Sequence, residues 1–441
     1  MSTRSLADAA HETNTEAPSH GQTLAQKILA RVSGVDAPVP GQIVEGAVDL
    51  AMGHEQAAQA VLPFHQMEAP RIWDPSRVVI AIDHWVPAST EGAAKLHQIL
   101  RHFAAEEGIT NFYDVGRHGI CHQVLAEDGW VVPGDLCVGT DSHTNMLGAM
   151  GAFAVGIGPT EFAAVLATGR IWLKVPPTIR VEVEGTLGKG VYAKDLILRI
   201  IREVRCDGAR YKAVEFQGPT ISRLSMSERF TICNMTTEMG AKAGMVAPDA
   251  TTREFLQPIA KHPMHPLTPD ADASYERTIS LDVDGMEPQV ACPYSPDNVR
   301  PMSEIVKEHV KVNQVFLGSC TNSRMDDLRI AARIFRGEKV HPGVRFIVSP
   351  ASTAIYRQCL KEGLVDLFTE GGAVFTNSSC SACFGGNMGI LAPDEACASS
   401  SNRNFPGRMG AKEARIYLMS PAAVALTAIR GEISDPREVL P

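Results

Sequence analysis

Three cysteines are the residues of this chain best suited to hold a metal centre. Cys380 and Cys383 are two residues apart, a spacing that lets two thiolates bind one centre, and Cys320 follows an apolar run typical of a buried strand. The Cys-x-x-Cys pair alone would also fit zinc, a redox couple or simple burial. A structural zinc site needs four ligands, and the sequence has no second Cys-x-x-Cys and no matching histidine pair. Three thiolates at one sheet edge instead suggest an iron–sulfur cluster in which one iron has no protein ligand.

An iron with an open position is a Lewis acid, which suits substrate activation rather than electron transfer. Other side chains could support such chemistry. Asp83-His84 and Asp141–His143 each place an imidazole beside carboxylates, which suits proton transfer near neutral pH. Arg403 and Arg408 offer two guanidinium groups, which bind carboxylates through paired hydrogen bonds. Taken singly, each feature is more often an ordinary surface or capping residue, but together with three thiols they favour an active site.

Four of these groups each follow an apolar run that predicts a buried strand: Asp83-His84, Asp141–His143, Cys320 and Cys380. The runs span residues 78–82, 135–140, 314–317 and 372–375. Residues 325–335 predict a helix with Gly337 as its cap, and residues 344–348 predict the next strand. This strand–helix–strand order predicts an α/β fold of parallel sheets with crossover helices. In such sheets sites lie beyond the carboxyl ends of the strands, which is where these polar groups fall.

The composition of the 441 residues excludes several classes of protein. A content of 44% hydrophobic and 21% charged residues is typical of a globular protein of about three domains. The net charge is -9 without a basic run, which argues against a general binder of nucleic acid or anionic membranes. The longest apolar stretch, Met146–Gly158, is too short to span a bilayer. Residues 1–20 lack the features of a signal or transit peptide, so we expect a cytoplasmic protein with reduced thiols.

Several motifs make the chain similar to the aconitase superfamily from about residue 22 to the C-terminus. In order, they are Gly139–Thr144, Gly318–Arg324, Cys380–Cys383 and Ser401–Phe405. Residues 321–329 and 397–405 most resemble the large subunits of 3-isopropylmalate dehydratases, whereas residues 404–410 resemble the archaeal-type large subunits that include homoaconitases. One departure is Cys-Ser-Ala-Cys-Phe at 380–384, where many relatives have Cys-Gly-Pro-Cys-Leu. Because the thiols are kept, only the shape of the local turn is affected.

The resemblance implies a role for each matching position. One [4Fe–4S] cluster per chain would be bound by Cys320, Cys380 and Cys383. The catalytic residues would be Asp83 and His84, which protonate the departing hydroxyl, Asp141 and His143 beside the open iron, and Glu238. The substrate would be contacted by Gln59, Ser142, Arg403 and Arg408. The surroundings of the cluster would include His122, Asn234 and Asn402.

The implied activity is that of a hydro-lyase large subunit, which isomerises 2-isopropylmalate and 3-isopropylmalate through 2-isopropylmaleate in leucine biosynthesis. Homoaconitate and methyl-substituted malates are alternative substrates. A cluster-bearing RNA-binding regulator is an alternative of a different class, against which the net charge of -9 speaks.

The implied organisation is a three-domain aconitase-like fold around the cluster. The expected boundaries are a flexible tail at 1–21 and domains at 22–177, 178–285 and 286–441, the last carrying the cluster cysteines. Single-chain members of the superfamily continue into a fourth, mobile domain that carries the catalytic base. The fifteen residues after Leu426 are too few for such a domain. We therefore expect a small subunit that carries this swivel domain, in a heterodimer or heterotetramer.

Overall fold

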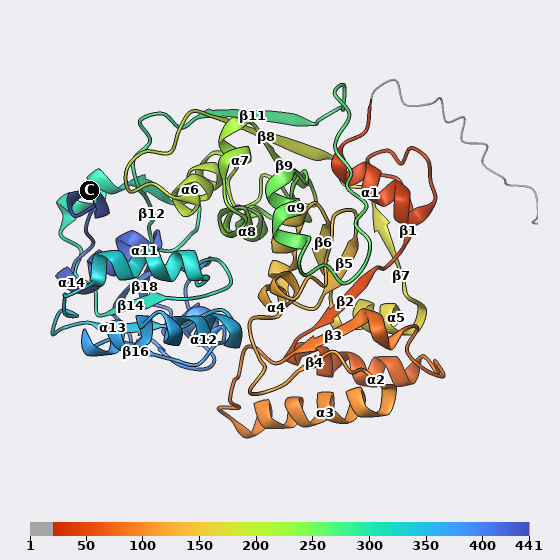
Figure 1. The fold of residues 1–441 in the computed structure, drawn as a ribbon, viewed down its shortest axis with the longest axis horizontal. Coiled ribbons are helices and arrows are strands. Elements are labelled where there is room, and N and C mark those ends of the chain that lie inside the picture. Colours follow the sequence, from red (N-terminus) through yellow and green to blue (C-terminus); the bar gives the residue numbers. More distant parts are fainter. Residues whose placement is uncertain (1–20, 441) are drawn as a thin grey trace, which may run out of the picture.

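The computed structural model describes residues 21–440, which form three large sheets with helices packed against them (Figure 1). The expected N-terminal tail lies outside this range except for Gly21, which forms a parallel bridge with Ala273. Each large sheet takes its strands from one continuous stretch of the chain: residues 50–156, 178–282 and 289–418. No helix within residues 21–440 is long and apolar enough to cross a membrane.

The first large sheet has five parallel strands in the order β4-β3-β2-β5-β6. The strands are β2 (Leu50–Gly53), β3 (Val78–Ala81), β4 (Phe112–Tyr113), β5 (Leu136–Gly139) and β6 (Phe153–Gly156). Its helices are α2 (Ala58–Gln66), α3 (Glu91–Glu107), α4 (Cys121–Glu127) and α5 (Pro159–Thr168). The side chain of Thr90 caps the start of α3, and Gly108 ends this helix at a φ of 74°.

The second large sheet has four parallel strands in the order β10-β9-β8-β11. They are β8 (Thr178–Glu184), β9 (Ala213–Gln217), β10 (Ala243–Val246) and β11 (Arg277–Asp282). The helices of this stretch are α6 (Ala193–Val204), α7 (Pro219–Arg223), α8 (Met226–Asn234) and α9 (Ala250–Leu256). The short helix η4 (Met235–Met239) continues α8 and carries Glu238 to the pocket described below.

The third large sheet has seven strands in the order β13-β12-β18-β17-β14-β15-β16. They are β12 (Gln289–Ala291), β13 (Val299–Pro301), β14 (Gln314–Leu317), β15 (Arg345–Val348), β16 (Val374–Phe375), β17 (Ala396–Ser399) and β18 (Arg415–Leu418). The five strands from β18 to β16 are parallel, and β12 and β13 extend the sheet antiparallel. The helices are α10 (Met302–Ile305), α11 (Met325–Phe335), α12 (Thr353–Lys361), α13 (Leu364–Glu370) and α14 (Pro421–Arg430).

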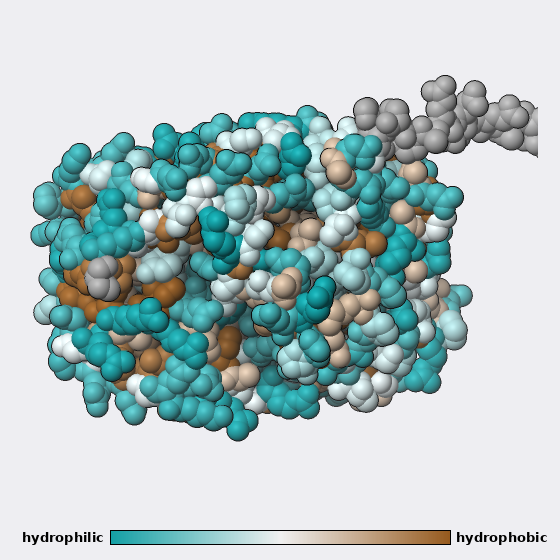
Figure 2. Space-filling model, turned by 45° about the horizontal axis from the view of Figure 1, so that its top comes forward, coloured by the Kyte–Doolittle hydropathy of each residue, from teal (hydrophilic) through white to brown (hydrophobic). Residues whose placement is uncertain are grey.

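The remaining elements are short. Helix α1 spans Leu24–Ser33, and β1 (Ile43–Ala47) pairs with β7 (Arg170–Lys174) in an antiparallel ribbon. The other short helices are η1 (Glu55–Ala57), η2 (Pro75–Arg77), η3 (Ser142–Met150), η5 (Val306–Glu308), η6 (Ser381–Phe384) and η7 (Pro436–Glu438). Hydrophilic residues cover most of the face in Figure 2, and the hydrophobic ones lie in small patches between them.

The α/β fold and its parallel strands are confirmed. Three of the four apolar runs form strands one or two residues shorter than predicted, and the fourth, Gln314–Leu317, forms β14 with the predicted bounds. Helix α11 also has the predicted bounds, and Gly337 follows it with a φ of 81°, a conformation that favours glycine.

Candidate active site

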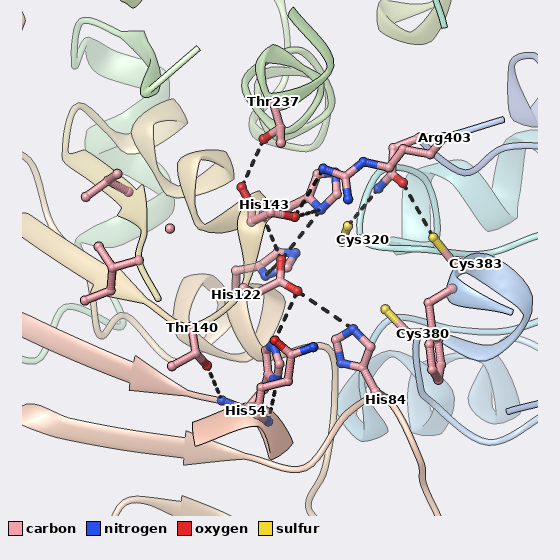
Figure 3. A pocket seen from close by; sticks show the side chains of 18 of the residues that line it. His54, His84, His122, Thr140, His143, Thr237, Cys320, Cys380, Cys383 and Arg403 are labelled. Atoms are coloured by element: carbon pink, nitrogen blue, oxygen red, sulfur yellow. Dashed lines mark hydrogen bonds and ion pairs between the residues drawn. The ribbon is translucent and has the colours of Figure 1, made fainter. Parts of the chain in front are cut away.

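The carboxyl ends of three neighbouring strands meet at one side of a pocket. In the five-stranded sheet, β3 leads to Asp83-His84, β2 to His54-Glu55 and β5 to Asp141–His143. Across the pocket, three strands of the seven-stranded sheet carry the sulfur side of the site: β14 leads to Cys320, β16 to Cys380–Cys383 and β17 to Asn402-Arg403. Figure 3 shows the imidazole rings and the three sulfur atoms around the same space.

The pocket has a volume of about 640 Å³. The predicted site residues that line it are His84, His122, Asp141, Ser142, His143, Cys320, Cys380, Cys383, Asn402, Arg403 and Arg408. Asp83, Asn234 and Glu238 lie behind this lining, and each is hydrogen-bonded to a residue of it. The structure therefore brings together residues spread over more than 300 positions of sequence.

The expectation for Gln59 is wrong. Gln59 lies on α2 with its side chain exposed and is not among the lining residues, whereas Gln56 lines the pocket. The reason is local: His54 caps the short helix η1 by accepting a hydrogen bond from the backbone N–H of Gln56, which places Gln56 at the strand end and Gln59 one turn further away. Gln56 is thus the glutamine available to a ligand.

Asp83 orients His84. Asp83 is fully buried, and its Oδ1 lies 2.5 Å from His84 Nδ1, while its Oδ2 accepts the backbone N–H of Cys121 at 2.9 Å. Burial alone would lower the pKa of His84, but the carboxylates of Asp83 and Glu55 outweigh it and raise this pKa well above its usual value. His84 is therefore protonated, and its Nε2 lies 3.8 Å from Asp141 Oδ2.

Asp141, His143 and Glu238 form a second buried chain of charges. Asp141 Oδ1 accepts the backbone N–H of His143 at 2.7 Å, and His143 Nε2 lies 3.1 Å from Glu238 Oε1. Burial opposes charge on His143, but Glu238 outweighs it and raises the pKa of His143 to about 9. Burial would raise the pKa of Glu238, but His143 and Arg403 lower it on balance. A carboxylate and an imidazolium thus stabilise each other here.

The two arginines have different partners. Arg403 donates from Nε to Glu238 Oε1 at 2.8 Å and from Nη2 to Ser142 Oγ at 3.2 Å, which fixes the plane of its guanidinium. Arg408 lies with Nη2 3.5 Å from Cys383 Sγ. Its Nε is a buried donor without an acceptor among residues 21–440. Both guanidinium groups line the pocket and retain donors for an anionic ligand.

Cys320 and Cys383 each lie beside groups that stabilise negative charge on sulfur. Cys320 Sγ accepts hydrogen bonds from the amides of Asn234 at 3.2 Å and Asn402 at 3.4 Å. A hydrogen bond from Cys380 lowers the pKa of Cys383 well below its usual value, against the effect of burial, and Arg408 adds to the shift. The surroundings of Cys383 therefore favour the thiolate over the thiol.

The loops that carry the cysteines have unusual backbone conformations. Ser319, directly before Cys320, has a φ of 84°, and Ser381, directly after Cys380, has a φ of 51°. Non-glycine residues in this left-handed region are strained, and they cluster at functional sites. The serine at 381 thus occupies a turn that glycine would adopt at lower cost.

The residues present fit an iron–sulfur cluster held by three thiolates. The three sulfurs line one pocket, and donors beside Cys320 and Cys383 favour thiolate. Within the described part of the chain, the buried polar atoms beside the pocket that have no hydrogen-bond partner include His122 Nε2, Glu238 Oε2 and Arg408 Nε. Because buried polar atoms are normally paired, these atoms can form hydrogen bonds to a group bound in the pocket.

His54-Glu55 also belongs to the site and was not predicted from the sequence. His54 lines the pocket, and its Nδ1 accepts a backbone N–H, so its Nε2 carries the proton and lies 3.6 Å from Asp141 Oδ2. The signal was available, because residues 50–53 form an apolar run that ends in His-Glu, as the run at 78–82 ends in Asp-His. Trp85 and Phe384, whose rings lie 5.2 Å apart, also line the pocket and were not predicted.

Comparison with known proteins decides the family. The model of the aconitase family (aconitate hydratase) matches residues 33–431. The chain belongs to the aconitase family. The chain is 51% identical to the 3-isopropylmalate dehydratase large subunit 1 of Methanopyrus kandleri, over 95% of this chain and 100% of that protein. The chain is 44% identical to the 3-isopropylmalate dehydratase large subunit of Wolinella succinogenes, over 95% of this chain and 100% of that protein. A probable methanogen homoaconitase large subunit of Methanosarcina mazei is 48% identical, over 89% of this chain and 99% of that protein.

Proposed function

We propose that this chain is the large catalytic subunit of a 3-isopropylmalate dehydratase. The observation that carries the proposal is the pocket itself, which combines three thiols with two carboxylate–imidazole groups and two arginines. Identity of 44–51% over nearly the whole length of relatives named for this activity supports it. The reaction moves a hydroxyl group between adjacent carbons of a substituted malate by elimination and readdition of water.

Cys320, Cys380 and Cys383 would hold a [4Fe–4S] cluster. When bound, the cluster supplies a Lewis acid at the iron that has no protein ligand. The amides of Asn234 and Asn402 and the guanidinium of Arg408 stabilise the thiolates. Because these donors come from three separate segments, the cysteine loops are held from several sides.

His84 would donate the proton to the departing hydroxyl group. Hydroxide is a poor leaving group, so an acid must protonate it as the bond breaks. Asp83 Oδ1 lies 2.5 Å from Nδ1 of the ring, so Nε2 is the nitrogen that faces the pocket. The raised pKa of His84, which reflects Asp83 and Glu55 outweighing burial, keeps the ring charged before the step.

The substrate carboxylates would be bound by Arg403, Arg408 and Ser142, with Gln56 at the other wall. The elimination removes a weakly acidic proton from the carbon next to a carboxylate, so negative charge grows on that carboxylate. Preoriented guanidinium donors stabilise this charge. The hydrogen bond from Arg403 to Glu238 at 2.8 Å fixes the guanidinium before the substrate arrives.

The base that removes the carbon proton would come from a small subunit. The relatives are themselves named large subunits, and this chain covers 98–100% of the length of four of them. The carboxylate partners of His84 and His143 raise the pKa of both imidazoles, which favours their protonated forms and makes them poor bases. The pocket would then be completed by the partner.

A substrate panel tests the proposal. The chain is co-expressed with the small subunit, purified without oxygen and assayed for loss of the ultraviolet absorbance of 2-isopropylmaleate, homoaconitate and methylmaleate. We expect the highest kcat/KM with 2-isopropylmaleate. A preference for homoaconitate, which the Methanosarcina mazei relative makes the second candidate, would replace the substrate while keeping the hydro-lyase chemistry. No turnover of any of the three would contradict the proposed function.

A further inference from the structure

Glu55 is a buried carboxylate that lies beneath the Asp83–Trp85 turn. It follows β2, the strand between β3 and β5, and its side chain is fully buried. Its Oε1 accepts hydrogen bonds from three consecutive backbone N–H groups: Asp83 at 2.9 Å, His84 at 2.8 Å and Trp85 at 3.1 Å. Three donors that converge on one carboxylate oxygen fix the path of the turn that presents His84.

The second oxygen of Glu55 places a negative charge between two imidazoles. Oε2 lies 3.7 Å from His84 Nδ1 and 3.9 Å from His54 Nδ1, and it has no hydrogen-bond partner among the described residues. From α3, His97 Nε2 lies 3.6 Å from Oε1. Burial alone would raise the pKa of Glu55, but His84 and His97 outweigh it and hold this pKa well below its usual value. Glu55 is therefore a carboxylate in the folded protein.

The turn that Glu55 holds joins the two sides of the pocket. The carbonyl oxygen of Asp83 accepts the backbone N–H of Cys380 at 3.0 Å, and Trp85 Nε1 donates to the carbonyl oxygen of Gly386 at 2.9 Å. The position of this turn sets where His84 Nε2 points relative to the loop that carries Cys380. A displacement of about 1 Å in such a site can cost roughly 100-fold in rate.

We propose that Glu55 is a positioning residue that acts through His84: its carboxylate orients the Asp83–Trp85 turn and thereby directs the His84 imidazole into the pocket. The proposal rests on the hydro-lyase function, in which His84 is the acid. Glu55 does not line the pocket and makes no contact with the substrate space. Its effect should therefore fall on the chemical step and not on substrate binding.

Three variants of the co-expressed complex test this role. Glu55→Ala removes the acceptor and should lower kcat roughly 100-fold with KM within about threefold of the parent. Glu55→Gln keeps an oxygen that can accept the three N–H groups, and its kcat should exceed that of Glu55→Ala at least fivefold, by roughly the worth of the retained hydrogen bonds. Glu215→Gln is the control, because Glu215 is also a buried glutamate that accepts a backbone N–H, at 3.1 Å from Ala25, but lies away from the pocket. It should keep the parent kcat.

A double-mutant cycle separates this role from a general structural one. In a His84→Ala background, Glu55→Ala should cause no further loss, because the group that it positions is already absent. If the losses of kcat in the two single variants multiplied in the double variant, the proposal would be overturned. A kcat of Glu55→Ala within threefold of the parent, or a kcat of Glu55→Gln no better than that of Glu55→Ala, would also overturn it.

Crystal structures of the parent chain and of Glu55→Ala give a test that does not depend on activity. We expect the Asp83–Trp85 turn and the His84 ring to move by about 1 Å or more in the variant, the scale of misplacement that impairs catalysis. An unchanged turn would overturn the proposal. If the parent complex were inactive on every substrate, the proposed function would fail, and the structural comparison would still decide the role of Glu55.

Discussion

Arg408→Lys should impair catalysis while leaving the protein folded. The Arg408 guanidinium lies with Nη2 3.5 Å from Cys383 Sγ, and its buried Nε has no acceptor among residues 21–440. It therefore touches the sulfur side of the site with one nitrogen and keeps others for the substrate. A lysine ammonium is a single point donor and cannot reproduce this two-sided geometry.

The magnitude follows from the number of donors lost. Removing one preorganised donor to developing negative charge costs about 2.7–4 kcal/mol, which corresponds to a factor of roughly 100 to 1,000. We therefore expect kcat/KM to fall at least about 100-fold, with kcat carrying most of the loss, because the charge grows in the transition state.

The assay is steady-state hydration by the anaerobically purified complex, with the visible absorbance of the cluster recorded in parallel. That absorbance should stay at the parent level, since all three thiols remain. Arg415→Lys, at an exposed arginine of β18, is the control and should match the parent. Near-parental kcat/KM in Arg408→Lys would refute the assignment of Arg408 to the substrate.

Three further predictions concern the thiols and the stability of the fold. Cys383→Ser should abolish the visible absorbance of anaerobically purified protein, whereas Cys359→Ser, at a buried thiol outside the pocket, should retain it; a fully coloured Cys383→Ser protein would contradict the ligand assignment. Asp249→Ala should lower the free energy of unfolding in urea by about 3 kcal/mol, because the buried Arg229 guanidinium donates two hydrogen bonds to the Asp249 carboxylate. An unchanged urea midpoint of unfolding would contradict this prediction. Burial raises the pKa of Glu215 to about 7, so folding favours its protonated form and stability should fall as pH rises from the unfolded-state value near 4.5 through about 7. Glu215→Gln should remove this loss, so its melting temperature should exceed that of the parent by more at pH 8 than at pH 5; an equal difference at both pH values would argue against it.

The parallel strands and the polar groups at their ends could be predicted from the sequence because both depend on local pattern. A strand buried on both faces is a continuous apolar run, and the run at 78–82 breaks off at Asp83-His84 without ambiguity. Parallel strands then bring their carboxyl ends to one edge, which is why Asp141 lies within 4 Å of the His84 ring. The approach of the sheet ends that carry Cys320 and His143 was implied only by the family resemblance.

Other parts of the site depend on tertiary contacts that local pattern does not encode. The choice between Gln56 and Gln59 is decided by the short helix that His54 caps, and a one-turn error changes which side chain faces the pocket. The hydrogen bond between Arg403 and Glu238 joins residues 165 positions apart and requires η4 to meet the end of β17. The apolar run at 50–53 places Glu55 at a strand end, but its three backbone donors are contacts that only the folded chain shows.

Whether the pocket needs a partner for turnover is decided by titrating the small subunit into the cluster-loaded chain. The rate of hydration of 2-isopropylmaleate is recorded at each ratio under anaerobic conditions. We expect no measurable rate for the chain alone and a linear rise that saturates at one small subunit per chain. Full turnover by the isolated chain would contradict the claim that its pocket lacks a base, and no turnover at any ratio would contradict the hydro-lyase function.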